Sequence, residues 1–470
     1  MIYYIIRETA IIFDEKKDPP MRQIDIARLL GHAVAYQCLS NRNGSSSWSY
    51  IWLNQGISTL LAMDAIDQVY PNYHIKDLFV VQTLQESFRL DTDSIMKPLI
   101  SEVNGPSDID SGFSFACYIK APAILRMLQY MLGEKVFQNG IDKYLSNDPF
   151  YGMEDIKAFW ISMQAAYDEQ NVMYLNLKET MEAWMTREHY PVMNVTQNKT
   201  HFVVTTESTS TKESEKEWWI PYIAMVMEES NFPLSKSMRY VSMNIGHFVH
   251  VSEDWLIVNL QQIGYYRVNY NAESLKRIAN YLNTDKYFKV HVLNRAQIID
   301  DVFYFLIRGQ LNLSVFMDLT MYLLMERSYI AWYSMFKAFE YMSSFFPFEE
   351  SSYIKERMIK IFDKLHQTVE YEERNDTVYF SSSLQQEATR WACAFGSFKC
   401  KKQAESELKV YLMQKREIGI TVILIDIINH VYSQSSLDKI NIFLEDYIIL
   451  QRGRLVFLDI HLLMIDYIIR

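Results

Sequence analysis

Two nearby segments decide how this sequence is interpreted: LLGHAVAYQ (29–37) and IWLNQGIS (51–58). His32 and Tyr36 are four residues apart, so on a helix they project from the same face. Gln55 follows Tyr36 after 18 intervening residues and begins a second expected helix over about 54–68. A helix with two ligands four residues apart, plus a carboxylate from a second helix, is a known way to hold zinc. The spacing of such a site is therefore present, but Tyr36 and Gln55 are not its usual ligands.

Length and composition indicate a multidomain globular protein. At roughly 150 residues per domain, 470 residues predict about three domains. Hydrophobic residues make up 49% and charged residues 22%, which excludes intrinsic disorder. With 57 acidic and 46 basic residues the net charge is −11, the wrong sign for binding a phosphate backbone. We expect no nucleic-acid partner.

The chain shows no secretion or membrane signal. The apolar start MIYYIIRETAIIFDEK is interrupted by Arg7 and Glu8, and neither a basic region nor a cleavage site accompanies it. No uncharged apolar run reaches the roughly 18 to 20 residues needed to cross a bilayer. The apolar segments at 418–428 and 455–469 are short or carry aspartates, so we expect core helices or strands there.

Four cysteines are too few for a disulfide scaffold, although Cys393 and Cys400 are close enough in sequence for one local bridge. Five Asn-X-Ser/Thr sequons would suit a secreted protein, but such triplets also arise by chance. They begin at Asn43, Asn194, Asn198, Asn312 and Asn375.

Hydrophobic patterning divides the chain into helical, β and helical regions. Asp18-Pro19-Pro20 is a helix-start signal, and Ile24, Leu30 and Val34 are expected on the apolar face of the helix that follows. A strongly amphipathic helix is expected over 121–132. Alternating β-branched and aromatic residues over 191–283 predict short antiparallel strands, with a polar loop at 206–217. From 284 onwards, amphipathic segments joined by short turns predict stacked helical hairpins.

The chain resembles the aminopeptidase N family of zinc aminopeptidases, particularly its insect members. That family has H-E-x-x-H, 18 residues and then Glu, in the form HELAHQWFGN…WLNEGFA. Here the same register gives HAVAYQCLSN…WLNQGIS without a gap. Further matches extend the resemblance over most of the chain. They are RETAIIFDEK (7–16), CYIKAPAILRML (117–128), WWIPY (218–222), QQIGYYRVNY (261–270), VLNRAQIIDD (292–301) and WACAFGSFKC (391–400).

The resemblance assigns a role to each position of the site. His32 matches the first zinc ligand, and Ala33 stands where the family has the general-base glutamate. Tyr36 replaces the second histidine ligand, and Gln55 replaces the glutamate ligand. Tyr118 matches the tyrosine that stabilises the tetrahedral intermediate. The family's Gly-Ala-Met-Glu-Asn motif, which holds the substrate's amino group, and its N-terminal β-domain would lie before Met1.

Each of these residues also has an ordinary structural interpretation. His32 fits a core or cleft histidine, and Tyr36 fits a packed aromatic that could also donate a hydrogen bond to Gln55. Tyr118 could be present for packing alone. Zinc prefers imidazole, thiolate or carboxylate ligands, and a tyrosine phenol with a pKa of about 10 must first lose its proton. We therefore expect no zinc to be bound here, although zinc is the family's cofactor.

The expected fold is mixed α and β: a degenerate thermolysin-like helical peptidase domain (1–190), an immunoglobulin-like β-sandwich (191–283) and a shortened helical superhelix (284–470). The expected function is that of an inactive pseudoenzyme that binds a peptide or protein. The alternative is an active zinc aminopeptidase that removes N-terminal residues from peptides. The resemblance also implies a Cys393–Cys400 disulfide, a possible dimer through the C-terminal helices, and an extracellular or membrane-associated location.

Overall fold

The structure is a computed structural model, and it describes most of the chain up to residue 406. The described residues are 6–14, 18–19, 21–42, 51–92, 97–100, 116–146, 155–170, 175–198, 201–208, 218–222, 224–227, 239–242, 247–250, 255–369, 378–402 and 405–406. The expected loop at 206–217 lies mostly outside them, as do both C-terminal apolar segments.

The chain divides into two compact units, Met1–Phe395 and Gly396–Arg470. In the second unit, residues 398–402 and 405–406 are helical. The first unit is mostly helical and contains a small sheet, as expected for a mixed multidomain chain.

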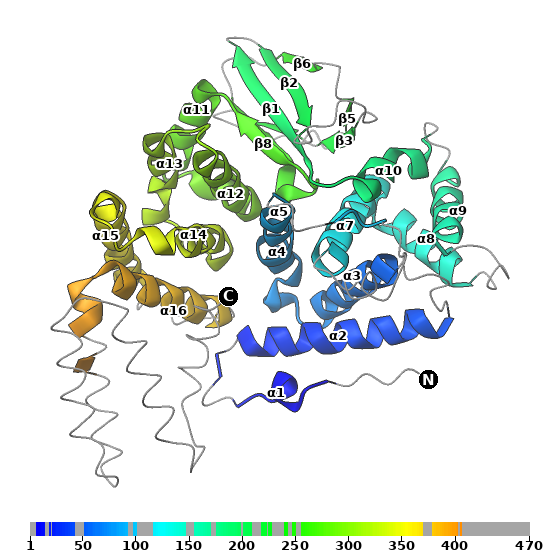
Figure 1. The fold of residues 1–470 in the computed structure, drawn as a ribbon, viewed down its shortest axis with the longest axis horizontal. Helices are drawn as coiled ribbons and strands as arrows, with labels where there is room; N and C mark the ends of the chain where they lie inside the picture. The colour runs from blue at the N-terminus through cyan, green and yellow to red at the C-terminus, as the bar shows by residue number, and fades with distance from the viewer. Residues whose placement is uncertain are drawn as a thin grey trace, which may run out of the picture. The chain divides into compact units, whose positions relative to one another are not determined.

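The first part of unit 1 is helical (Figure 1). Its elements are α1 (Glu8–Ile11), α2 (Met21–Arg42), α3 (Ile51–Val69), η2 (Pro71–Tyr73), α4 (Ile75–Phe79), η3 (Val80–Leu84), α5 (Gln85–Thr92), η4 (Ala116–Lys120), α7 (Ala121–Leu132), α8 (Glu134–Ser146), α9 (Asp155–Asp168) and α10 (Leu177–Thr186). The helices expected at 54–68 and 121–132 correspond to α3 and α7.

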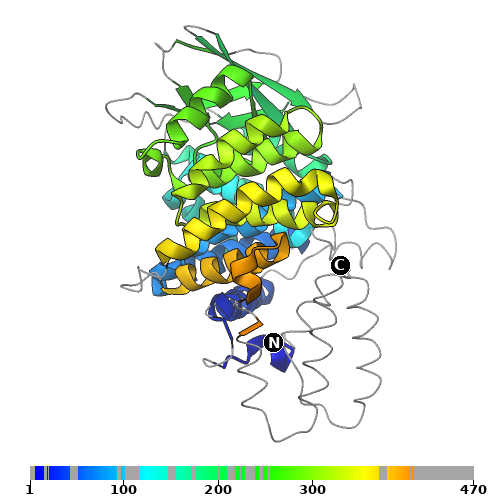
Figure 2. The ribbon, with the colours of Figure 1, turned by 90° about the vertical axis from the view of Figure 1, so that its left-hand side faces the viewer.

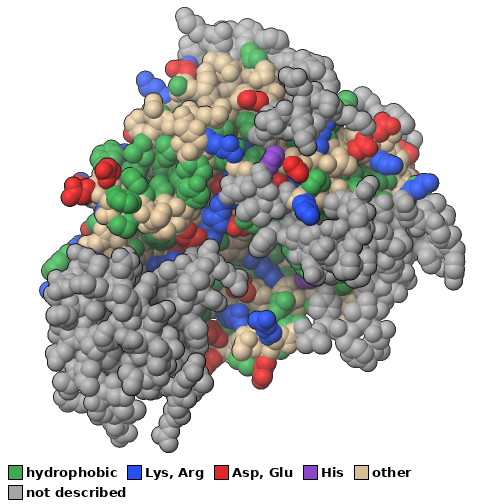
Figure 3. Space-filling model, viewed as in Figure 1, with side chains coloured by type: hydrophobic (Ala, Val, Ile, Leu, Met, Phe, Trp, Pro, Cys, Tyr) green, Lys and Arg blue, Asp and Glu red, His purple; other side chains and the backbone are tan. Residues whose placement is uncertain are grey.

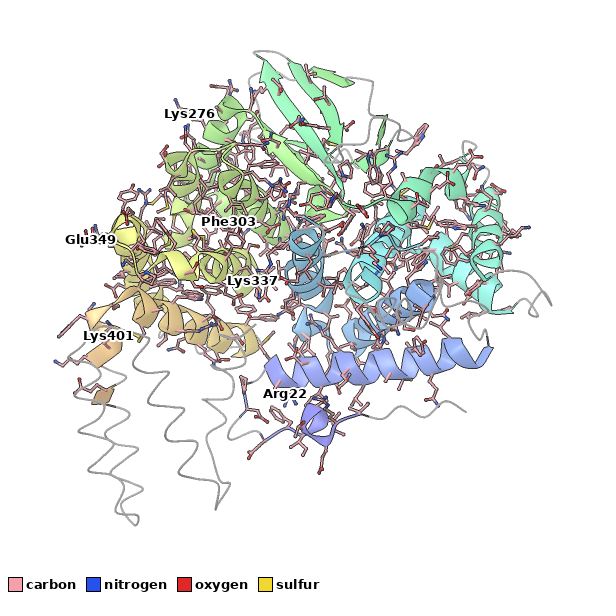
Figure 4. The ribbon with its side chains drawn as sticks, in the orientation of Figure 1. Arg22, Lys276, Phe303, Lys337, Glu349 and Lys401 are labelled. Carbon is pink, nitrogen blue, oxygen red and sulfur yellow. The ribbon has the colours of Figure 1, made fainter. Side chains whose placement is uncertain are left out.

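Helix α2 packs along α3, and its buried face differs from the one the sequence predicted. Ile24 and Leu39 are buried, but Leu30 and Val34 are 42% and 62% exposed. At Gly31 the two helices approach so closely that a Cβ atom would lie 3.1 Å from Ile66 Cδ1. The contact with α3 decides which face of α2 is buried, more than the number of apolar residues on each face does. At the start of α2, the Arg22 guanidinium donates to the Thr9 carbonyl of α1 at 2.5 Å (Figure 4).

Short strands occupy the middle of the chain: β1 (Pro191–Asn198), β2 (His201–Ser208), β3 (Trp219–Tyr222), β4 (Ala224–Met227), β5 (Arg239–Ser242), β6 (His247–His250), β7 (Trp255–Val258) and β8 (Arg267–Tyr270). A four-stranded sheet has the order β6-β2-β1-β8, in which β1 and β2 form an antiparallel pair and β1 runs parallel to β8. Strands β3 and β5, and β4 and β7, form two-stranded ribbons.

Helices resume directly after β8. They are α11 (Ala272–Leu282), η6 (Tyr287–Lys289), α12 (Val292–Ile307), α13 (Leu313–Leu319), η7 (Thr320–Leu324), α14 (Tyr329–Met342), η8 (Ser343–Phe345), η9 (Glu349–Ser351), α15 (Ser352–Val369) and α16 (Val378–Phe395). Helix α12 packs on α13 and α14, and α16 packs on α14 and α15 (Figure 2). Phe303 of α12, labelled in Figure 4, lies against the rings of Phe316 and Tyr341.

A buried loop between β7 and β8 joins the helical parts. Asn259, Gln261 and Gln262 all have positive φ values, between 51° and 61°. The Arg126 guanidinium of α7 donates to the carbonyls of Gln262 and Gln261 at 2.8 and 3.2 Å. A Cβ at Gly264 would lie 2.0 Å from the ring of Tyr266, so only glycine fits there. The segment QQIGYYRVNY is therefore needed for the fold.

Acidic and basic side chains of the described residues are intermixed on the face drawn in Figure 3. None of the helices among the described residues is long and apolar enough to cross a membrane.

Candidate functional site

The candidate site lies where α2 packs along α3, and α3 in turn packs closely on α7. Gly56 follows Gln55 on α3, and a Cβ on it would lie 2.7 Å from Leu125 Cδ1 and 3.3 Å from the Ala121 carbonyl carbon of α7. A Cβ at this position would therefore push against Leu125, so the close approach of α3 to α7 favours glycine here. Because Gln55 is only 4% exposed, its amide must find partners inside the protein.

His32 provides that partner. Its Nε2 lies 2.8 Å from Gln55 Oε1, so the second turn of α3 and the middle of α2 are joined by a hydrogen bond between side chains. The other ring nitrogen, Nδ1, lies 3.2 Å from the hydroxyl of Thr59. Thr59 is one turn after Gln55 on the same helix, and its hydroxyl also lies 2.9 Å from the Gln55 carbonyl oxygen. Both nitrogens of His32 therefore face polar groups of α3.

The hydrogen bonds fit a neutral imidazole. If Nε2 carries the proton, it donates to Gln55 Oε1. Nδ1 can then accept from the Thr59 hydroxyl only if that hydroxyl gives up its bond to the Gln55 carbonyl oxygen, because it has one proton. If the Gln55 amide is turned over, its NH2 group donates to Nε2, and Nδ1–H donates to Thr59 instead. Burial lowers the pKa of His32, and the hydrogen bond with Gln55 opposes this in part. In the second arrangement both ring nitrogens are hydrogen-bonded while Thr59 keeps its bond to the Gln55 carbonyl oxygen. In the first arrangement Thr59 gives up one of its two contacts.

Tyr36 lies one turn further along α2, with its ring stacked near that of His32. The ring centroids are 6.2 Å apart and the planes differ by 28°. Burial raises the pKa of the Tyr36 phenol, which makes the phenolate needed for metal binding still less accessible. The packing interpretation of Tyr36 accounts for this ring contact.

The residues present do not fit a zinc ion. They offer one imidazole whose nitrogens are both engaged, a phenol whose pKa is raised, and a neutral amide oxygen, whereas zinc sites use imidazole, thiolate and carboxylate. Ala33, 7% exposed, has no group that could move a proton. Within the described ranges, no three His, Cys, Asp or Glu side chains gather in a way that could hold a metal.

Tyr118 lies in η4, which packs against α3, and its side chain is 41% exposed. The end of η4 is fixed by Lys120, whose ammonium lies 2.9 Å from Asp91 Oδ2 with both side chains buried. Asp91 also accepts from the backbone N–H of His189 and the hydroxyl of Tyr265, both at 3.1 Å. This buried network fixes the backbone next to Tyr118.

Thr59 is the site residue that sequence reasoning missed. The signal was available, because a residue four positions after Gln55 lies on the same helix face. Elsewhere, Cys393 and Cys400 are both disulfide-bonded, and Cys38 on α2 is free and exposed.

Two side chains four residues apart on one helix, with a third on the next helix, have the layout by which one class of zinc metallopeptidase holds its metal. The comparisons with known proteins agree. Residues 2–184 match the peptidase family M1 domain, and residues 255–441 match the ERAP1-like C-terminal domain. The chain therefore belongs to the M1 family of aminopeptidase N proteins.

Individual relatives give the same result. Aminopeptidase N of Plutella xylostella is 31% identical over 351 residues, which cover 72% of this chain and 37% of the relative. Aminopeptidase N of Rattus norvegicus is 27% identical over 76% of this chain and 38% of the relative. The thyrotropin-releasing hormone-degrading ectoenzyme of Rattus norvegicus is 26% identical over 88% of this chain and 41% of the relative. The chain thus spans about two fifths of the length of these curated relatives.

Proposed function

We propose that this chain is a catalytically inactive aminopeptidase N-like protein that holds no zinc at the family's metal position. The observation that carries this proposal is the pairing of both His32 nitrogens with α3. Gln55 Oε1 and Thr59 Oγ1 lie 2.8 and 3.2 Å from them. A metal would have to break at least one of these hydrogen bonds, and it would find only one good ligand in return.

Loss of catalysis follows from a second, independent position. In a zinc peptidase, the metal activates a water molecule and a neighbouring carboxylate accepts its proton. Ala33 stands at that carboxylate position and cannot accept a proton. General-base catalysis contributes about 10²- to 10⁴-fold by itself, so even a metal-loaded site would lack this factor.

The remaining role that the site supports is binding of a peptide or protein. Tyr118 is 41% exposed, and the Lys120–Asp91 ion pair fixes its segment. An exposed aromatic side chain on a fixed backbone offers apolar contact area together with one polar group. The binding role and the absence of catalysis form one proposal, because each concerns the same group of helices.

The finer architecture is also a proposal. We assign residues 1–190 to a degenerate thermolysin-like domain, 191–283 to an immunoglobulin-like β-sandwich and 284–470 to a shortened superhelix. The M1 match over 2–184 and the start of β1 at Pro191 support the first boundary. Helix α11 begins at Ala272, so the second segment ends in a helix. Dimerisation through the C-terminal helices concerns residues that mostly lie outside the described ranges.

Metal analysis of the purified chain tests the proposal. We expect well under one zinc per chain after incubation with zinc and removal of the excess, and no turnover of an aminoacyl-anilide. Near-stoichiometric zinc together with turnover would establish the alternative, an active aminopeptidase that removes N-terminal residues, which the family match favours.

A variant that restores the ligands provides the positive control. The triple change Ala33→Glu, Tyr36→His and Gln55→Glu supplies the imidazole and carboxylate ligands together with the general base. We expect it to bind zinc. The matched control Ala33→Glu adds a carboxylate but leaves Tyr36 and Gln55, and we expect it to stay free of zinc. If the control and the wild type hold the same amount of zinc and the triple variant holds more, the changes at Tyr36 and Gln55 explain why the wild type binds no zinc.

A further inference from the structure

The turn between α12 and α13 carries the sequon Asn312-Leu313-Ser314 on the protein surface. Residues 308–310 before it are exposed, with Gly309 at φ 70°. Leu311 packs against the buried cluster of Val192, Tyr304 and Phe305, which anchors the backbone next to the sequon. The two helices lie side by side, as Figure 1 shows. The sequon is therefore held in an ordered position on an exposed turn.

The acceptor side chain is available there. Asn312 is exposed and has extended backbone angles, φ −81° and ψ 143°, just before the first residue of α13. Asparagine at this position commonly caps its helix through its side chain, but Asn312 makes no such capping bond. Ser314, which supplies the hydroxyl of the sequon, is also exposed.

The sequon that begins at Asn194 also has described side chains, but its asparagine lies within a sheet. Asn194 is in the middle of β1, between Thr205 of β2 and Asn269 of β8. Its Nδ2 donates to Glu207 Oε2 at 3.2 Å, and its Oδ1 accepts from Asn269 Nδ2 at 3.0 Å. A glycan on Asn194 Nδ2 would replace one of the two amide hydrogens next to Glu207 and would have to fit between the side chains of β1, β2 and β8. The sequons beginning at Asn43, Asn198 and Asn375 have asparagine side chains outside the described residues.

We propose that Asn312 is an N-glycosylation site of this protein and that Asn194 stays unmodified in the folded chain. The co-reactant is a lipid-linked oligosaccharyl pyrophosphate. A bond forms between Asn312 Nδ2 and the anomeric carbon of the sugar, while the bond from that carbon to the pyrophosphate oxygen breaks. The lipid pyrophosphate leaves with the electron pair of that bond, and the amide nitrogen loses one proton. Neither the sugar nor the protein changes its oxidation state.

Two further observations support this site. Cys393 and Cys400 are disulfide-bonded, which points to an oxidising compartment, and the secretory pathway is one. Ile307 and Leu313, on either side of the turn, are 44% and 38% exposed. A glycan on Asn312 would cover part of this apolar surface, in keeping with the solubilising role of such groups. The inference does not depend on the absence of catalysis.

Peptide mass spectrometry of the full chain, expressed behind a cleavable leader in cultured mammalian cells, tests this proposal. The secreted protein is treated with peptide N-glycosidase in heavy-oxygen water, which converts each glycosylated asparagine to a labelled aspartate. We expect the label at position 312 in most molecules and none at position 194. An unlabelled peptide containing Asn312 in the secreted chain would overturn the proposal, as would label at Asn194.

Variants provide a second readout. Asn312→Gln and Ser314→Ala should each remove one glycan, seen as the same single step in gel mobility. Ser314→Thr keeps the sequon and should keep the glycan. The matched control Asn194→Gln should leave the mobility unchanged. If Asn312→Gln and Ser314→Ala both run like the wild type, the site is not used.

Discussion

Replacing Gln55 by glutamate should raise the pKa of His32, which lies below its ordinary value in the wild type. In the wild type, burial lowers the pKa of His32, and the hydrogen bond with Gln55 raises it. Gln55→Glu keeps the size of the side chain but places a negative charge where Oε1 lies 2.8 Å from Nε2. At an effective dielectric constant of about 20, the attraction at this distance is about 6 kcal/mol. Burying the new carboxylate costs several kcal/mol, so we expect a net gain of about 1.4 to 4 kcal/mol for the imidazolium.

This gain corresponds to a His32 titration midpoint about one to three pH units higher in the variant than in the wild type. The control Gln55→Leu should move the midpoint the other way, because it removes the hydrogen bond that raises the pKa. Leucine would also leave Nε2 without its partner on α3, at a cost of about 1 to 3 kcal/mol in stability.

The assay is a pH titration of the chain labelled with ¹³C at histidine Cε1, followed by nuclear magnetic resonance in buffer containing a chelator. The sequence has 10 histidines, and His32→Asn identifies the signal. If Gln55→Glu and Gln55→Leu shift the midpoint in the same direction, or not at all, the His32 ring does not face residue 55. The interpretation of the site would then be wrong.

The same change should invert the pH dependence of stability. In the wild type, the folded pKa of His32 lies below its unfolded value of about 6.5. Its stabilising contribution is therefore present above about pH 6.5 and is lost as the pH falls through the folded pKa. In Gln55→Glu the folded pKa lies above the unfolded value. The contribution of the ion pair is then complete below about pH 6.5 and is lost as the pH rises through the folded pKa.

Two further predictions concern the packing that positions the site, and denaturation curves measure both. Gly56→Ala places a Cβ 2.7 Å from Leu125 Cδ1, and we expect this overpacking to lower the free energy of unfolding by about 1 to 3 kcal/mol. The higher helix propensity of alanine would offset about 0.5 to 1 kcal/mol of that loss. Gly31→Ala places no atom closer than 3.1 Å to its new Cβ, with Ile66 Cδ1 at that distance and Ala62 Cβ at 3.3 Å, so it should cost less than Gly56→Ala. Equal effects would contradict the closer approach at Gly56. Lys120→Met leaves the buried carboxylate of Asp91 unpaired and should cost about 3 to 5 kcal/mol; a loss under 1 kcal/mol would show that the pair is not buried.

The local signals in the sequence were strong enough to predict the helices of the site. Helix α7 spans Ala121–Leu132, the expected range, and α3 spans Ile51–Val69 around the expected 54–68. A periodic apolar pattern fixes such helices because it depends only on residues within a few turns. The spacing of His32, Tyr36 and Gln55 and the match to aminopeptidase N came from the same local patterns.

The partners of each side chain depended on contacts that no local pattern records. The sequence left open whether Tyr36 would bond to Gln55, and it gave no role to Thr59. The crossing of α2 on α3 places His32 between Gln55 and Thr59. It also leaves Val34 62% exposed, although that residue was expected on the apolar face.

Residue types and their spacing were enough to identify the family and to single out His32, Tyr36 and Gln55. The contacts of His32 could be known only from the packed helices. Two helices had to meet before His32 could pair with both Gln55 and Thr59, and a hydrogen bond between helices depends on how they pack.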